Sequence, residues 1–186
     1  DPEIWWDDWE EAEPNPNPAV GSHLGVHGIA SNSIVALAQL AADQGKPFPV
    51  VKAVDQLSWL NEVKRVIPST LTLARLHHHE EGSSDADELM LPILFKITET
   101  PELVNFVDYW EVSNERMGGG SSSDAYRELA LATIECMEIA ERANLKLAIF
   151  SFNNGTPEWA DMVAIVETGV FARAKVGGHI LAVHEG

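Results

Sequence analysis

The sequence predicts an α/β fold in which parallel strands alternate with helices. Short apolar segments typical of buried strands recur along residues 23–186. Between them lie longer segments with apolar residues three and four positions apart, which predict amphipathic helices. The two kinds of segment alternate six times, at roughly 27 residues per unit. Such alternation is typical of a parallel sheet with right-handed crossover connections.

The composition is that of an ordinary globular domain. Of the 186 residues, 45% are hydrophobic and 22% are charged, which is enough for one sizeable core. The 29 acidic residues exceed the 12 Lys and Arg residues, so the net charge is −17. Because this charge repels phosphate groups and anionic lipids, neither nucleic acid nor a membrane is an expected partner. The single cysteine, Cys136, allows no intrachain disulfide and is expected in the core.

Residues 1–20 are expected to form a leader or linker distinct from the folded domain at 21–186. Three tryptophans stand among seven acidic residues, and an alternation of Pro and Asn follows at 14–18. Proline at alternate positions excludes a helix or central strand and favours an extended chain. The tryptophans could clamp this leader onto the domain, or contact a partner or a sugar. A linker of this kind favours an extracellular or cell-surface location.

The strands are predicted from short segments rich in Val, Ile, Leu and aromatic residues. In chain order, the predicted strands are residues 23–29, 49–54, 71–76, 106–112, 145–152 and 179–184. Most are apolar on both faces, which indicates strands covered by helices rather than exposed to solvent.

The helices are predicted from helical spacing and from their end signals. In chain order, the predicted helices are residues 31–44, 58–66, 88–95, 101–105, 124–144 and 157–176. Gly45 and Gly177 are expected to end the first and the last, Asp124 to cap the fifth, and Pro157 to begin the sixth. Residues 77–87 are expected to form a polar loop.

The polar residues at the strand ends favour a (β/α)8 TIM-barrel-like fold over an open doubly wound sheet. The first strand–helix turn lacks both GxGxxG and GxxxxGK[ST], so no nucleotide or other cofactor is expected. A complete barrel with units of this length needs about 240 residues. Six visible units therefore predict an incomplete barrel, a six-strand variant, or a barrel that another chain or segment completes.

The sharpest motif is YWEVSNE at residues 109–115, where the fourth strand ends. General acid catalysis needs a carboxyl group that stays protonated long enough to donate a proton to a leaving oxygen. A Glu among aromatic residues at a strand end can stay protonated through partial desolvation. Glu115 is therefore a candidate for that proton donor.

This motif resembles the fourth-strand ending of the clan A glycoside hydrolases, the retaining TIM-barrel enzymes, which is commonly aromatic-Glu-x-x-Asn-Glu. The resemblance implies that Glu115 is the general acid/base and that Asn114 hydrogen-bonds the sugar 2-hydroxyl. It also implies a nucleophilic Glu at the end of a seventh strand, which this sequence does not contain. In retaining enzymes the two carboxyl groups lie about 5–5.5 Å apart.

Further substrate contacts are expected from other strand ends. The candidates are His27, Arg75, His77, Asn153, His184 and Glu185. Arg75 could form a salt bridge with Glu111 or Glu115 and keep that carboxylate charged. Amides suit hydroxyl recognition, although Asn-Asn-Gly at 153–155 is also an ordinary turn signal. Trp59 and Trp159 are expected to pack in helices rather than to stack on sugars.

The run HHHEE at residues 77–81 raises a metal site as an alternative. A metal-dependent hydrolase would use His27, His77 and His184. Contiguous histidines lack the spacing of structural zinc sites, however, and a solvated loop is the simpler interpretation, so no metal is expected.

The sequence therefore predicts a glycoside hydrolase-like domain that acts on a neutral carbohydrate by the retaining mechanism. Two alternatives stay open. One is a catalytically inactive carbohydrate-binding or interaction module derived from such a barrel. The other is the metal-dependent hydrolase.

Overall fold

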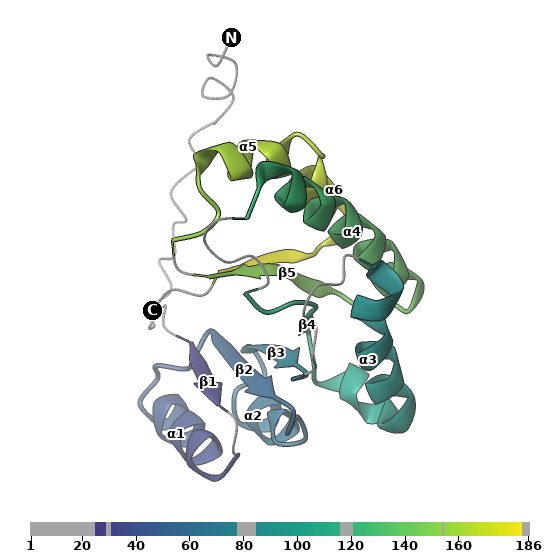
Figure 1. The fold of residues 1–186 in the computed structure, drawn as a ribbon. Coiled ribbons are helices and arrows are strands. Elements are labelled where there is room, and N and C mark those ends of the chain that lie inside the picture. Colours follow the sequence, from purple (N-terminus) through teal and green to yellow (C-terminus); the bar gives the residue numbers. More distant parts are fainter. Residues whose placement is uncertain (1–24, 29–30, 78–84, 116–120, 154, 184–186) are drawn as a thin grey trace.

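The computed structural model describes residues 25–28, 31–77, 85–115, 121–153 and 155–183. Its six strands form one sheet in the order β1-β2-β3-β4-β5-β6, and every neighbouring pair is parallel. The strands are β1 (Val26–Gly28), β2 (Val50–Val54), β3 (Leu71–Arg75), β4 (Tyr109–Glu111), β5 (Leu147–Phe152) and β6 (Ile180–Val183). The predicted alternation of strands and helices is confirmed, and the sheet curls into a half-barrel (Figure 1).

The helices lie on the outer side of the curled sheet (Figure 1). They are α1 (Ser31–Asp43), α2 (Leu60–Val66), α3 (Ala86–Glu99), the 3-10 helix η2 (Pro101–Asn105), α4 (Ser123–Arg142), α5 (Trp159–Val166) and α6 (Val170–Gly177). None of the helices in the described part of the chain is long and apolar enough to cross a bilayer.

The core lies between the sheet and these helices. In the central strands, residues such as Val51 and Ala53 in β2 and Trp110 in β4 are almost completely buried, whereas the edge strands β1 and β6 contain no buried residue. Because side chains alternate across a strand, the residues between them lie on the inner face of the half-barrel. Trp59 and Cys136 are buried, as predicted.

Several helix starts differ from the prediction by one or two residues, α2 beginning at Leu60 rather than at residue 58. The N-cap of α4 is Ser122, whose hydroxyl accepts the Ala125 N–H (3.2 Å), and Asp124 lies within the first turn. Helix α3 begins two residues earlier than predicted and extends four residues further. The Asp85 carboxylate caps it by accepting the N–H groups of Asp87 (2.8 Å) and Glu88 (3.3 Å). Ser and Asp are both good caps, so sequence alone did not decide between neighbouring candidates.

The last predicted helix is wrong in two respects. It is two helices, α5 and α6, because Gly169 adopts φ 78° between them and interrupts helical geometry. Pro157 lies outside α5, whose N-cap Glu158 forms a capping box with Asp161. Trp159, expected to pack in the helix, is 78% exposed.

Candidate functional site

A buried charge cluster lies on the inner face of the half-barrel, near the carboxyl ends of three strands. Lys52 comes from β2, Arg75 from β3 and Glu111 from β4. Arg75 and Glu111 are paired in the parallel register, so their side chains project from the same face. Lys52 lies two residues before Val54 in β2, so both side chains project from the inner face of the sheet. Val54 is the register partner of Arg75.

Glu111 is the centre of this cluster. Its side chain is only 1% exposed, and its carboxylate contacts the Lys52 ammonium and lies 3.7 Å from Arg75 Nη1. A carboxylate this buried needs cationic partners to offset its lost hydration. Burial lowers the pKa of Lys52, and the Glu111 carboxylate opposes that shift.

The predicted salt bridge of Arg75 is therefore formed with Glu111. The cluster also contains residues that the sequence analysis did not single out as site residues. Lys52 is 12% exposed and Glu111 less still, so neither is an ordinary surface charge. The signal was a lysine as the only charged residue of the apolar strand segment PVVKAV.

Asn114 is hydrogen-bonded to the cluster through Arg75. Arg75 Nη1 donates a hydrogen bond to Asn114 Oδ1, and Asn114 is half-buried. The neighbouring Glu115 is exposed, so the partial desolvation that the sequence analysis expected for its carboxyl group is not found. Its carboxylate lies close enough to Lys52 to raise the pKa of that lysine slightly. The structure thus brings Arg75, Asn114 and Glu115 to one site.

The backbone around Glu115 is strained. Glu115 has φ 49°, and its N–H donates to the carbonyl of Ser151 (3.0 Å), which itself has φ 47°. Phe150 has φ 74°, the register of β5 shifts after it, and its carbonyl accepts the Ser113 hydroxyl (3.1 Å). Left-handed non-glycine residues persist only where neighbouring contacts hold them, and they concentrate at functional sites.

Asp55, directly after β2, adds a fourth left-handed residue at this end of the sheet, with φ 58°. In the described chain one other non-glycine residue has a positive φ: Asn144, in the turn before β5. The strain is thus concentrated at the edge where the sequence analysis expected the active face.

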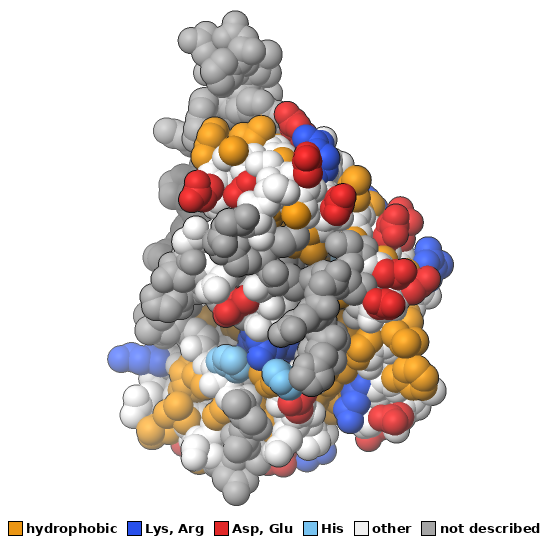
Figure 2. Space-filling model, in the orientation of Figure 1, with side chains coloured by type: hydrophobic (Ala, Val, Ile, Leu, Met, Phe, Trp, Pro, Cys, Tyr) orange, Lys and Arg blue, Asp and Glu red, His pale blue; other side chains and the backbone are white. Residues whose placement is uncertain are grey.

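Two other predicted contact residues, His27 and His77, lie on β1 and directly beyond β3. His27 is exposed on β1 and is the register partner of Lys52. His77 is exposed after β3, and its N–H donates to the Asp55 carboxylate (2.6 Å). Figure 2 shows basic side chains beside two histidine side chains near the middle of the face it presents.

Asn153 takes part in a local turn, because its carbonyl accepts both the N–H and the hydroxyl of Thr156 (each 3.1 Å). This contact fits the turn signal read from the sequence. His184 and Glu185 lie outside the described residues, as do the leader at 1–20 and most of the HHHEE run. Within the described ranges, no group of three His, Cys, Asp or Glu residues is placed to hold a metal ion.

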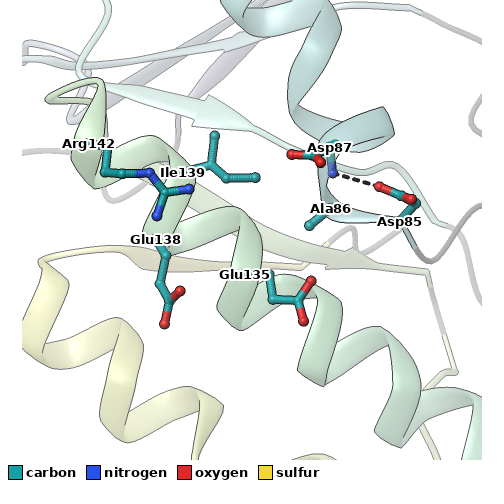
Figure 3. A pocket seen from close by; sticks show the side chains of 7 residues that line it. All are labelled: Asp85, Ala86, Asp87, Glu135, Glu138, Ile139 and Arg142. Atoms are coloured by element: carbon teal, nitrogen blue, oxygen red, sulfur yellow. Dashed lines mark hydrogen bonds between the residues drawn. The ribbon is translucent and has the colours of Figure 1, made fainter.

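A separate pocket lies between the start of α3 and the second half of α4 (Figure 3). Its lining includes Asp85, Asp87, Glu135, Glu138 and Arg142. Asp85 is the cap of α3 and accepts the Asp87 N–H, as the dashed line in Figure 3 shows. Of these carboxylates, that of Asp85 caps a helix, and the pocket shares no residue with the Lys52–Glu111–Arg75 cluster.

Comparison of the chain with protein-family models and with curated proteins found no match. The functional interpretation therefore rests on the strand-end motif and on the geometry around Glu115.

Proposed function

We propose that this chain forms most of a TIM-barrel-like glycoside hydrolase domain, in which Glu115 is the acid/base toward a neutral carbohydrate. The observation that carries the proposal is the setting of Glu115. It is an exposed carboxylate, held in a left-handed conformation by Ser151, directly after an amide that Arg75 fixes. The fourth-strand motif supports the same assignment.

In this proposal Glu115 first donates its proton to the glycosidic oxygen as the bond breaks. Asn114 hydrogen-bonds a sugar hydroxyl and holds the ring in place. In the second step the ionised Glu115 takes a proton from the water that hydrolyses the glycosyl–enzyme intermediate. Both steps need the exposed position of Glu115.

The nucleophilic carboxylate has to come from elsewhere. Glu111 is unsuited because it is almost fully buried and is paired with Lys52 and Arg75. We propose that another chain or segment completes the barrel and brings this group. The edge strand β6 supports completion, since the side chains of Leu181 and Val183 are about half exposed.

The test measures binding and turnover in the same protein. Binding is measured by calorimetry with cellohexaose, mannohexaose and xylohexaose, and turnover with dinitrophenyl glycosides of the matching sugars. Glu115→Ala is compared with Glu128→Ala, an exposed Glu on α4. We expect turnover only where a completed barrel supplies the nucleophile. Glu115→Ala should lose turnover, whereas Glu128→Ala should not. Azide should restore part of the turnover of Glu115→Ala, because it attacks the glycosyl–enzyme intermediate without a general base.

A second candidate, a carbohydrate-binding module without activity, is favoured by the burial of Glu111 beside the site. Hexaose binding without turnover under every condition would establish it. Absence of both binding and turnover with all three sugars would overturn the carbohydrate proposal for those classes.

A further inference from the structure

Four polar side chains form a continuous series that leads from β2 to the residue before Glu115. Lys52 contacts Glu111, Glu111 contacts Arg75, and Arg75 donates to Asn114. The first three are at most 15% exposed, so they are poorly placed to make most of the contacts with a ligand. Asn114, the last of the series, is half-buried and directly precedes the exposed Glu115.

The chemistry of the last contact fixes how the Asn114 amide is oriented. A guanidinium group has only donors, whereas an amide has one accepting oxygen and one donating NH2 group. Asn114 therefore turns Oδ1 toward Arg75. Its NH2 group necessarily points away from Arg75.

Arg75 can hold this orientation because it is itself held. An arginine side chain has many rotamers, and fixing one costs entropy unless a partner selects it. The buried Glu111 carboxylate selects the rotamer of Arg75, and Lys52 occupies the other carboxylate oxygen of Glu111. Removal of Glu111 or Lys52 should therefore loosen the Asn114 amide through its contact with Arg75.

We propose that Lys52, Glu111 and Arg75 are positioning residues that present the NH2 group of Asn114 to the ligand, so that the site selects a hydrogen-bond acceptor there. The identification of that acceptor as a sugar hydroxyl oxygen rests on the proposed function. The orientation of the amide rests only on the contacts of this chain.

The first experiment needs no ligand. The side-chain amide of Asn114 is observed by 15N NMR and assigned by its loss in Asn114→Asp. Arg75→Met and the double variant Lys52→Met/Glu111→Leu are compared with wild type, with the Asn153 amide as internal control. The double variant removes two of the three charges of the cluster and leaves Arg75 without the Glu111 carboxylate, so its folding is checked by urea unfolding before its amide signals are compared.

We expect the Asn114 amide to be rigid in wild type and to lose order in both variants, while Asn153 is unchanged. Arg75→Lys, which keeps a donor but not the planar fork, should restore part of the order. An Asn114 amide that stays equally ordered in a folded double variant would overturn the proposal.

The second experiment separates this inference from the proposed function. Affinity for whichever of the three hexaoses binds should fall about tenfold in Arg75→Met, as expected when one charged hydrogen-bond partner is lost. Arg127→Met on α4 is the matched control and should bind normally, since Arg127 pairs with Glu167 instead. Equal hexaose affinity of Arg75→Met and wild type would refute the positioning role and leave the proposed function standing. An ordered, Arg75-dependent Asn114 without hexaose binding would support the role and refute the carbohydrate function.

Discussion

At the scale of single residues, buried ionisable side chains are found at both ends of the sheet. The carboxyl end holds Lys52, Arg75 and Glu111, which surround the proposed site. The amino end holds His179, whose Nδ1 accepts the Leu147 N–H (2.9 Å). In our proposal the cluster at the carboxyl end positions a ligand-binding residue. His179 instead links the start of β5 to the chain before β6.

The first prediction concerns the buried ion pair. Lys52→Met should lower the free energy of unfolding by about 1–3 kcal/mol, because the buried Glu111 carboxylate loses its nearer cationic partner and keeps Arg75. Lys52→Met/Glu111→Leu should not recover that loss, because Arg75 is then left in the buried cluster without the Glu111 carboxylate. Urea unfolding measures both. Equal stability of Lys52→Met and wild type would show that Glu111 does not need Lys52.

The second prediction concerns acid. Burial lowers the pKa of His179, so the folded protein resists a proton that the unfolded chain takes up below about pH 6.5. Hydrogen bonds from Arg173 and His179 lower the pKa of Glu141 to about 2. Both groups stabilise the fold at neutral pH. The His179 contribution fades as the pH falls below 6.5, and that of Glu141 fades from about 4.5 downward.

His179→Gln should therefore lose less stability than wild type between pH 7 and about pH 5.5. Its control is His27→Gln, because His27 is exposed. Urea midpoints at the two pH values measure the effect. A wild-type midpoint that stays constant over this range would contradict the assignment.

At the scale of elements, local contacts decide where helices begin and break. Ser122 caps α4, although Asp124 two residues later is an equally good cap residue. Gly169 separates α5 from α6 by adopting a left-handed conformation.

The third prediction compares the two cap candidates of α4. Ser122→Ala should destabilise the protein by about 1 kcal/mol, because the Ala125 N–H loses its acceptor. Asp124→Ala removes only a favourable charge from the first turn and should cost about half as much or less. Urea unfolding of the two variants decides between them. A larger loss of stability in Asp124→Ala than in Ser122→Ala would indicate that Asp124 is the N-cap of α4.

At the scale of the whole molecule, the six parallel strands make a half-barrel with edges at β1 and β6. Exposed apolar strand edges promote association with other strands. The exposed positions Leu181 and Val183 lie on one of these edges. The architecture thus favours a partner strand at β6.

The fourth prediction follows from this edge. Native mass spectrometry should show a species heavier than the 20.4 kDa chain, from self-association or from a completing polypeptide. Leu181→Lys should shift it toward the single chain without loss of folding, because the side chain is already half exposed. A monodisperse 20.4 kDa wild-type species would contradict completion of the barrel by a separate chain.

Several features were fixed by the sequence itself. The order of strands and helices follows from local hydrophobic period, and the placement of Trp59 and Cys136 in the core follows from it as well. The convergence of Arg75, Asn114 and Glu115 was also predictable, because parallel strands bring their carboxyl ends to one edge.

Only the tertiary structure decided the rest. The partnership of Lys52 with Glu111 joins strands that are not adjacent, so it depends on the curl of the sheet. The left-handed residues Phe150 and Ser151 sit in a segment that reads as an ordinary strand, and contacts with Ser113 and Glu115 accompany that geometry. Trp159 reads as a packing residue, yet its side chain at the first position of α5 is 78% exposed. Local patterns specify elements, whereas these features arise between elements that are distant in the chain.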